Sequence, residues 1–327
     1  MTIVNTVLVP ASGGPAGINT IKSLRSGGFY GDIVATDASA LSAGFSLASS
    51  HAVLPVASNE DSFFMKLVEV IENNKVDILM PTSQTDGYVY SKRRADLGKV
   101  GALAVISDVD AMKTCIDKLM LYDALSGKFN LPYTTADPEA LSGFPVIAKP
   151  RSGKGSRDVF PIRDEKELDY ISSRHRDMIF QEYLPGTEYT VDVLSDLDRN
   201  AIVAVPRIRL ETKGGISTKG KVIHHPELQE TSLQIAESIG IRGPCCVQMK
   251  ESRGGQLKLV EVNPRLGGGT IFATLAGANF PKMIIDMAEG KKITVPDFSD
   301  ITVIRYFEEI VMKEVIVEPI QTSTATT

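Results

Sequence analysis

Three polar side chains near the C-terminal end of the chain are spaced so that they could act together. The stretch 257–265, LKLVEVNPR, combines aliphatic and β-branched residues with a proline, which predicts a strand ended by a residue that cannot donate to a ladder. Side chains alternate between the faces of a strand, so one face is expected to carry Leu257, Leu259, Glu261, Asn263 and Arg265. That face starts apolar and ends with a carboxylate, an amide and a guanidinium. These groups suit a hard cation that carries phosphates.

A partner strand is predicted just upstream, at residues 245–250. The link 251–256 is polar and holds Gly254-Gly255, a favoured centre for a hairpin. A turn centred between these glycines pairs Gln248 directly with Glu261 and adds a third oxygen ligand. The alternative is an amphipathic hairpin whose polar end faces water, and these two strands alone leave both interpretations open.

Length and composition restrict the class of protein. A chain of 327 residues predicts two or three domains, and 43% hydrophobic with 23% charged residues is typical of soluble proteins. A net charge of -5 gives no reason to expect a nucleic-acid partner. No apolar run approaches membrane-spanning length, the N-terminus lacks a signal-peptide pattern, and the three cysteines form neither a disulfide framework nor a zinc spacing. We therefore expect a cytoplasmic protein without a membrane partner, and a homodimer remains open.

The first third of the chain predicts a parallel α/β domain. Residues 3–9 are typical of a buried strand, 18–26 of a helix and 32–36 of a second strand, and further strands are expected at 51–55, 76–80 and 104–106. Gly14, Gly17 and Asp37 fit a dinucleotide fingerprint, but Ser12 occupies its first glycine position. A nicotinamide-dependent oxidoreductase built on residues 1–110 is therefore an alternative function.

Two helical segments of this domain carry further expectations. Residues 61–73 predict a helix with one apolar face, formed by Phe64, Leu67, Val68 and Ile71. After the strand at 76–80, Thr85 and Asp86 either cap the next helix or touch a substrate, and capping is the commoner use of these residue types.

The middle of the chain supplies basic residues at the ends of predicted elements. Asp117-Lys118 lies at a helix that runs to about residue 129, and a strand at 143–150 carries Lys149 near its end. The basic, glycine-bearing loop 151–159 could cradle phosphates through its backbone or form a surface hairpin. After a helix at 164–176, strands are expected at 178–184, 188–194 and 201–210. Residues 211–225 are expected to form a long functional or mobile loop in which His224-His225 has no zinc spacing.

Taken together, these residues resemble the ATP-grasp superfamily, most closely one half of the carbamoyl-phosphate synthase large subunit and its single-copy relatives. The resemblance covers nearly the whole chain. It rests on residues 117–118, on Lys149-Pro150 with its loop, on 181–188 (QEYLPGTE), and on 247–249 with 260–265. It implies an α/β and α+β fold with a Rossmann-like domain at 1–110, an ATP-grasp N-terminal subdomain at 111–184, a C-terminal subdomain at 185–317 and a flexible tail at 318–327.

The resemblance also implies a role for each matching position. Lys118 and Lys149 would contact ATP phosphates, and the phosphate-covering loop would be Gly153, Lys154, Gly155 and Ser156. The adenine hinge would be Gln181, Glu182, Tyr183 and Leu184, and Glu188 would bond the ribose. Magnesium, or manganese, would be held by Gln248, Glu261 and Asn263. Arg265 would neutralise the transferring phosphoryl group.

The implied reaction joins a carboxylate to an amine through an acyl phosphate, at the expense of ATP. Arg207, Arg209, Lys219 and Lys221 are candidates to hold the acid, and a solvated basic loop is the alternative for them. The chain holds one such half rather than two, so synthesis of carbamoyl phosphate alone is not expected. A nucleotide-binding regulator without catalysis is a further alternative. The sequence identifies neither the acid nor the amine.

Overall fold

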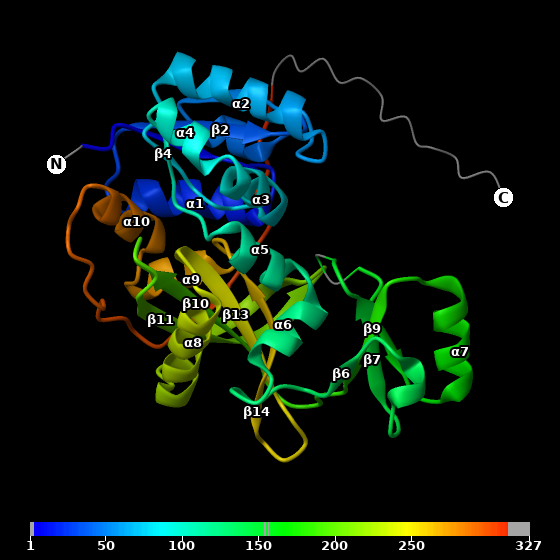
Figure 1. Cartoon of the computed structure of the whole chain (residues 1–327). Helices are drawn as coiled ribbons and strands as arrows, with labels where there is room; N and C mark the ends of the chain where they lie inside the picture. The colour runs from blue at the N-terminus through cyan, green and yellow to red at the C-terminus, as the bar shows by residue number, and fades with distance from the viewer. Residues whose placement is uncertain (1–2, 154, 156, 313–327) are drawn as a thin grey trace.

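The computed structural model describes residues 3–153, 155 and 157–312. Lys154 and Ser156 of the predicted phosphate loop and the predicted tail 318–327 lie outside the described residues. No helix within the described ranges is long and apolar enough to cross a membrane. Figure 1 shows the N-terminal domain above a central sheet, with a smaller sheet to one side.

The N-terminal domain is built on a parallel sheet in the order β3-β2-β1-β4-β5. Its strands are β1 (Thr6–Val9), β2 (Asp32–Asp37), β3 (Ser50–Val53), β4 (Ile78–Leu79) and β5 (Leu103–Ala104). In β1, Val7 is paired with Ile33 of β2 and Ile78 of β4, and all three side chains are buried. Strand order reverses between β1 and β4, so a crevice opens at the carboxyl ends of these strands.

Helices cover both faces of this sheet: α1 (Pro15–Ser26), α2 (Glu60–Asn74), α3 (Gln84–Lys92), α4 (Arg94–Lys99) and the 3-10 helix η1 (Ala43–Leu47). The helix α2 buries Phe63, Leu67, Val70 and Ile71, and Phe64 packs partly buried against the same cluster. The predicted apolar face was therefore wrong at Val68 and missed Phe63 and Val70. The predicted cap of α3 also needs correction. Ser83 is the N-cap, and its hydroxyl accepts from the backbone N–H of Asp86 at 3.3 Å.

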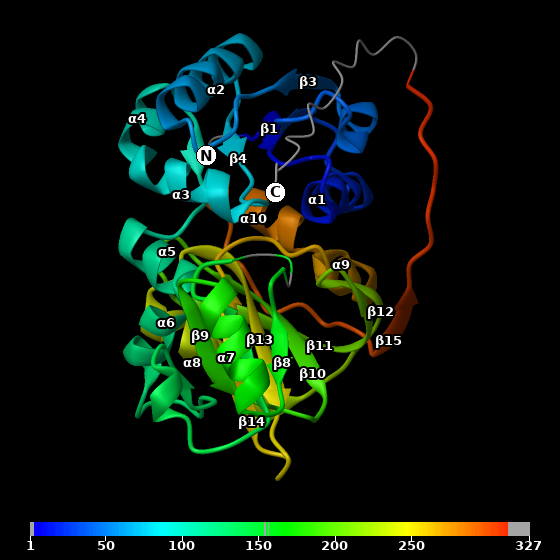
Figure 2. The same cartoon turned by 90° about the vertical axis from the view of Figure 1, so that its right-hand side faces the viewer.

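A small antiparallel sheet follows the connecting helices α5 (Val109–Ile116) and α6 (Lys118–Leu125). Its order is β6-β9-β7-β8, with β6 (Thr134–Thr135), β7 (Val146–Pro150), β8 (Phe160–Ile162) and β9 (Met178–Glu182). A short 3-10 helix, η2 (Pro138–Ala140), lies between β6 and β7. The helix α7 (Glu165–Arg174) is charged on all sides except for Ile171 and Leu168, which pack on the sheet. The sheet therefore has one covered face and one face turned to the rest of the molecule (Figure 2).

A larger antiparallel sheet in the order β14-β13-β10-β11-β12-β15 forms the centre of the molecule. Its strands are β10 (Glu188–Ser195), β11 (Ala201–Lys213), β12 (Ile216–Val222), β13 (Gly243–Glu251), β14 (Leu257–Asn263) and β15 (Ile301–Ile304). The long loop predicted at 211–225 was wrong, because β11 extends to Lys213 and β12 pairs with it. In β12, exposed Lys219 and Lys221 alternate with buried Gly220 and Val222, and Ser217 is buried nearer the start of the strand, so small residues conceal the strand pattern.

Helices α8 (Pro226–Ile239), α9 (Thr270–Ala276) and α10 (Phe280–Ala288) complete the fold. α8 covers one face of the central sheet and buries Leu228, Ile235 and Ala236. α9 and α10 lie between the central sheet and α1 of the N-terminal domain (Figure 1). One hydrophobic core thus runs through both parts, and its members include Val7, Ile21, Leu194, Phe272 and Ile284. This shared core holds the N-terminal domain against the central sheet.

Gly17→Ala is expected to destabilise the protein by about 1–3 kcal/mol, the usual cost of overpacking. Gly17 is buried in α1, where a Cβ atom would lie 2.6 Å from the Cα of Ser12 and 2.7 Å from the carbonyl oxygen of Ala11. Both are backbone atoms, so the loop or the helix must move. Gly98→Ala in exposed α4 is the control, with nothing within 4 Å of its Cβ, and should stabilise by about 0.5–1 kcal/mol. Equal melting temperatures for the two variants would contradict this view of the α1 packing.

Candidate active site

The β13–β14 hairpin confirms the predicted pairing of Gln248 with Glu261, but by a different route. The pairs nearer the turn, such as Glu251 with Leu257 and Met249 with Leu259, place the turn centre on Gly254 rather than between the two glycines. A register shift between Gln248 and Met249 then inserts Val260 as an extra residue on β14. The bulge and the turn offset cancel, and Gln248 therefore faces Glu261 as expected.

The same bulge corrects the predicted common face of β14. Leu257 and Leu259 pack in the core beneath α8, together with Val262. Val260, Glu261, Asn263 and Arg265 line a cavity on the other face. Because two consecutive residues of a bulge oppose one residue of the partner strand, the alternation of side chains shifts at Val260. The apolar start and the polar end of β14 thus lie on opposite faces.

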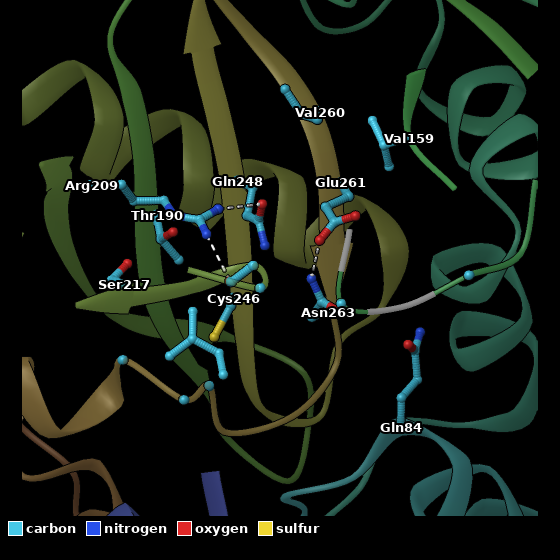
Figure 3. A pocket seen from close by; sticks show the side chains of 18 of the residues that line it. Gln84, Val159, Thr190, Arg209, Ser217, Cys246, Gln248, Val260, Glu261 and Asn263 are labelled. Atoms are coloured by element: carbon cyan, nitrogen blue, oxygen red, sulfur yellow. Dashed lines mark hydrogen bonds between the residues drawn. The ribbon is translucent and has the colours of Figure 1, made fainter. Parts of the chain in front are cut away.

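The cavity has a volume of about 750 Å³ and is lined by all three parts of the chain. Figure 3 shows Gln248, Glu261 and Asn263 on neighbouring strands, facing Val159 from the loop before β8 and Gln84 from the N-terminal domain. A cavity of this size, walled by two sheets, can hold a nucleotide-sized ligand together with a small molecule.

The oxygen-bearing side chains of the hairpin lie in a short chain of hydrogen bonds. The amide nitrogen of Asn263 donates to Glu261 Oε1 at 2.8 Å, and an Arg265 N–H donates to the Asn263 oxygen at 3.4 Å. Gln248 Oε1 accepts from Arg209 at 3.2 Å. No group of three or more His, Cys, Asp and Glu side chains in the described part of the chain could hold a metal ion. One carboxylate and two amide oxygens therefore suit a magnesium ion that takes its other ligands from phosphates and water.

Buried Lys149 on the small sheet and half-buried Lys118 on α6 face this carboxylate. Lys149 is 6% exposed, and its ammonium donates to Gln181 Oε1 at 2.9 Å. Burial lowers the pKa of Lys149 to about 8, and the negative charge of Glu261 opposes this change. Burial also lowers the pKa of Lys118, again opposed by Glu261 and by Asp117. Among the described residues neither lysine has a salt bridge, so the cavity presents cations that an anionic ligand would neutralise.

The local structure around Lys118 holds it at the cavity edge. Asp117 caps α6 by accepting from the N–H groups of Leu119 and Met120, and its carboxylate also accepts from Arg151 at 2.7 Å. The backbone N–H of Lys118 donates to the carbonyl of Arg151 at 3.0 Å. These contacts tie the start of α6 to the start of the loop 151–159. Gly153, which accepts from the Lys118 ammonium at 3.3 Å, and Gly155 both line the cavity.

The predicted adenine hinge, residues 181–184, lines the cavity at the end of β9. Its polar side chains are occupied by neighbours, because Gln181 bonds Lys149 and Thr134, and Glu182 accepts from Lys258 at 2.6 Å. Leu184 is buried and Tyr183 is half-exposed. The side-chain contacts thus fix the strand end and leave the apolar groups and the backbone to contact a ligand.

The comparisons with known proteins agree with this geometry. A family described as "ATP-grasp in the biosynthetic pathway with Ter operon" matches residues 174–310. The carbamoyl phosphate synthase large chain of Methanobrevibacter smithii is 25% identical over 292 residues, which are 80% of this chain and 27% of that protein. The D-alanine--D-alanine ligase of Thermotoga maritima is 29% identical over 173 residues, 50% of this chain and 54% of that protein. This chain belongs to the ATP-grasp superfamily.

Solved structures with low sequence identity confirm the predicted fold class of this ATP-grasp protein. Biotin carboxylase from Campylobacter jejuni superposes with a TM-score of 0.72 at 17% identity, over 90% of this chain and 74% of that one. N5-carboxyaminoimidazole synthetase from Staphylococcus aureus gives a TM-score of 0.70 at 16% identity, over 91% and 81% of the chains. ATP-grasp enzymes generally catalyse ATP-dependent ligation through acyl phosphates and typically use ATP and Mg²⁺. The chain spans only 27% and 28% of the length of the first two large chains that it matches.

Two arginines of the ATP-grasp cavity form ion pairs and hydrogen bonds that the sequence did not indicate. Arg209 bonds Glu188, Gln248 and the carbonyl of Gly215, and Arg207 forms a fully buried pair with Asp192. Lys219 pairs with Glu211 at 2.8 Å, and neither Lys219 nor Lys221 lines the cavity. The structure therefore brings Arg207, Arg209 and Arg265 together at the cavity and leaves the two lysines on the outside.

Two groups near the ATP-grasp cavity were not identified from the sequence. Asp192 is 1% exposed and accepts from Arg207, from the Thr270 hydroxyl at 2.8 Å and from the Cys246 thiol at 3.3 Å. The glycines 267–269 also line the cavity beside the start of α1. From the sequence, the alternation of side chains along β10 could have indicated Asp192, and the run of three glycines could have indicated residues 267–269. His224 and His225 have structural contacts, since one bonds Asp300 and the other caps α8.

Proposed function

We propose that this protein is an ATP- and magnesium-dependent ligase that activates a carboxylate as an acyl phosphate and joins it to an amine. The observation that carries the proposal is the convergence of buried Lys149 and half-buried Lys118 on the cavity that also holds Glu261, Asn263 and Gln248. Cations without a salt bridge opposite a carboxylate suit a ligand that brings both negative charge and a metal ion. A polyphosphate with bound magnesium is such a ligand, and manganese is the alternative metal.

In this proposal, the nucleotide lies between the small sheet and the central sheet. Residues 181–184 hold the adenine through backbone groups and through Leu184, and Glu188 bonds the ribose. Lys118 and Lys149 contact the phosphates, with Gly153 and Gly155 covering them. The contact of Glu188 with Arg209 supports a fixed orientation for this carboxylate. Lys154 and Ser156 complete the predicted loop, but they lie outside the described residues.

Gln248, Glu261 and Asn263 would hold the metal, which offsets charge on the β- and γ-phosphates when it is bound. A carboxylate oxygen of the substrate attacks the γ-phosphorus, the bond to the bridging oxygen breaks, and ADP leaves with the electron pair. In this proposal Arg265 neutralises the transferred phosphoryl group, and its side-chain hydrogen bonds to described residues, which go to neutral oxygens of Leu266 and Asn263, support that role. Arg209 would support this end of the site through Gln248. The protein thus acts mainly by positioning and by electrostatics.

In this proposal, each of the three parts of the chain has its own role. Residues 1–110 close one side of the cavity, residues 111–184 supply the phosphate and adenine contacts, and residues 185–317 supply the metal ligands, as far as they are described. The carboxylate and the amine would enter between the N-terminal domain and the central sheet, where Gly14, Pro15 and Gly267 line the cavity. Their identity is left to experiment.

The oxidoreductase alternative is disfavoured by the β1–α1 loop. The Ser12 hydroxyl is buried against Ser42 at 2.9 Å, and Ser12 accepts from the N–H of Gly44 at 3.1 Å. Asp37, which would bond a ribose in a dinucleotide site, instead accepts from Gly13 at 2.8 Å and from Ser39 at 2.9 Å. These contacts occupy the serine and aspartate groups at the positions that a dinucleotide site would use.

We expect ADP and phosphate release from ATP and magnesium when the correct carboxylate and amine are supplied. Pools of amino acids, small acids and amines are screened, with release measured by a coupled assay. Release that requires both an acid and an amine supports the ligase. If every pool stays at background while ATP binds in calorimetry, the non-catalytic regulator replaces the ligase. Binding of NADH without binding of ATP would favour the oxidoreductase.

A further inference from the structure

A second cavity of about 320 Å³ lies in the N-terminal domain, beside the active-site cavity. It sits at the carboxyl ends of the parallel strands, where residues following β1, β2, β3 and β4 come together. In open parallel sheets this crevice is the usual ligand position. Ala11, Ser83 and Thr85 line both cavities, so the two spaces adjoin.

The two cavities differ in charge. Among the described residues, the larger cavity is lined by seven Lys or Arg side chains and three Glu side chains. The smaller cavity is lined by two aspartates, Asp37 and Asp86, and by no Lys, Arg or His. A phosphate or a carboxylate would therefore be attracted to the first space and repelled from the second. A cationic group would show the opposite preference.

A buried hydroxyl provides an independent sign of a missing ligand. Thr36 lines the smaller cavity, is 1% exposed, and its Oγ1 has no hydrogen-bond partner. A buried hydroxyl without a partner costs free energy, and a bound donor would recover that cost. Asp37 is adjacent in β2, and N–H groups of Gly13 and Ser39 fix its carboxylate. An ammonium group in this cavity could donate to both the hydroxyl and a carboxylate.

The remaining wall is apolar. Leu54, Val56 and Phe63 line the cavity, and Leu54 and Phe63 are buried in the core of the N-terminal domain. Methylene groups would pack against this wall, while the charged end of the same molecule meets the aspartates. The site therefore matches an aliphatic chain that ends in a cation better than it matches a sugar or an acid.

We propose that this cavity holds the amine co-substrate, and that this co-substrate is an aliphatic diamine or a related amine with a second cationic nitrogen. The inference rests on the proposed ligase function. The second nitrogen stays protonated at Asp37 and Asp86, and the first reaches past Ser83 into the active-site cavity. There the neutral amine attacks the carbonyl carbon of the acyl phosphate. A C–N bond forms, the C–O bond to phosphate breaks, and phosphate leaves as HPO₄²⁻ with the proton that the nitrogen loses.

The test measures binding to the full chain by calorimetry, with 1,4-diaminobutane, 1-aminobutane and 1,4-butanediol as probes. We expect saturable binding of the diamine, and binding at least about tenfold weaker for each probe that lacks one or both cations. Asp86→Asn should weaken diamine binding by at least about tenfold. Thr36→Val should weaken it several-fold without loss of melting temperature, because it removes a hydroxyl that has no partner. Asp110→Asn is the matched control, since Asp110 is fully exposed on α5, and it should bind as the wild type does.

The outcomes separate this inference from the ligase proposal. Equal binding of the diamine and the monoamine, or unchanged binding in both Asp86→Asn and Thr36→Val, overturns the assigned site. If the diamine binds but is never consumed while other amines support ADP release, the co-substrate role is overturned and the ligase stands. If no acid and no amine supports ADP release, the ligase itself fails. The inference is supported if the enzyme consumes the diamine and if Asp86→Asn raises the KM for the diamine.

Discussion

Glu261→Gln is expected to abolish ligation while the protein stays folded. Glu261 is the one carboxylate in the proposed metal set, and its loss should lower kcat/KM by at least about 100-fold, the scale seen when one electrostatic contact to a developing charge is removed. The fold should tolerate the change, because the Glu261 side chain is only partly buried and bonds Asn263 through an oxygen that glutamine retains. The measurement compares ADP release and melting temperature with those of the wild type.

A second readout separates metal binding from chemistry. Mn²⁺ binding in the presence of a non-hydrolysable ATP analogue, followed by electron paramagnetic resonance, should weaken in Glu261→Gln. Glu230→Gln is the control, because Glu230 is exposed on α8 and its only described partner is the Gln234 side chain. Wild-type turnover in the Glu261→Gln variant would contradict the assignment of Glu261 as a metal ligand. Lost turnover with intact Mn²⁺ binding would instead give Glu261 a role in orienting the substrate.

The hairpin shows what sequence patterns can and cannot predict about this site. The glycine pair fixed the approximate turn, and the pairing of Gln248 with Glu261 was predicted from it. The bulge at Val260 was not, because a bulge depends on how both strands meet the core under α8 rather than on local residue types. The predicted common face of β14 failed for this reason. The polar residues nevertheless reached the cavity, since the bulge moves Val260 and Glu261 to the same side.

The central sheet shows a second limit. Strand β12 was missed because its buried positions include Ser217 and Gly220, which carry no hydrophobic signal. Gly220 is small because the ring of Phe272 packs there, and a Cβ atom would come within 2.8 Å of that ring. Such a requirement comes from a helix 50 residues away in the chain. The parallel strands of the N-terminal domain were predictable, by contrast, since apolar runs and βαβ connections are local features.

The ion pairs of the cavity arginines could not be predicted from the sequence either. Arg207 and Arg209 were predicted as candidates to hold the acid, but nothing local indicated that Arg207 pairs with Asp192 and Arg209 with Glu188. Two of the candidate cations therefore already have carboxylate partners, whereas Arg265, Lys118 and Lys149 form no salt bridge with the described residues. Buried charge without a partner is unfavourable for the empty protein and becomes useful when an anion arrives.

Lys149→Met should therefore weaken nucleotide binding and change how stability depends on pH. A charge-assisted hydrogen bond contributes about 1.5–3 kcal/mol, so ATP affinity is expected to fall by about 10- to 100-fold in calorimetry. In the wild type without nucleotide, the pKa of Lys149 is about 8 in the folded protein and near 10.5 in the unfolded chain. Between these values the unfolded chain binds more protons, so the free energy of unfolding should rise as the pH rises from about 8 to 10.5. The variant should lack that rise.

The difference between the two pH curves reports the titration of Lys149 together with its charge coupling to Lys118, and cancels the titration of more distant groups. Lys128→Met is the control, because Lys128 is exposed and its replacement should leave the wild-type curve in place. Saturating MgATP supplies the second condition. A triphosphate beside Lys149 favours the ammonium and raises its pKa, so the rise in stability between pH 8 and 10.5 should shrink in the wild type and stay absent in the variant. If the free energy of unfolding depends on pH in the same way in the wild type and in Lys149→Met, Lys149 does not carry a buried, uncompensated charge. An ATP-insensitive wild-type curve would place the phosphates elsewhere in the cavity.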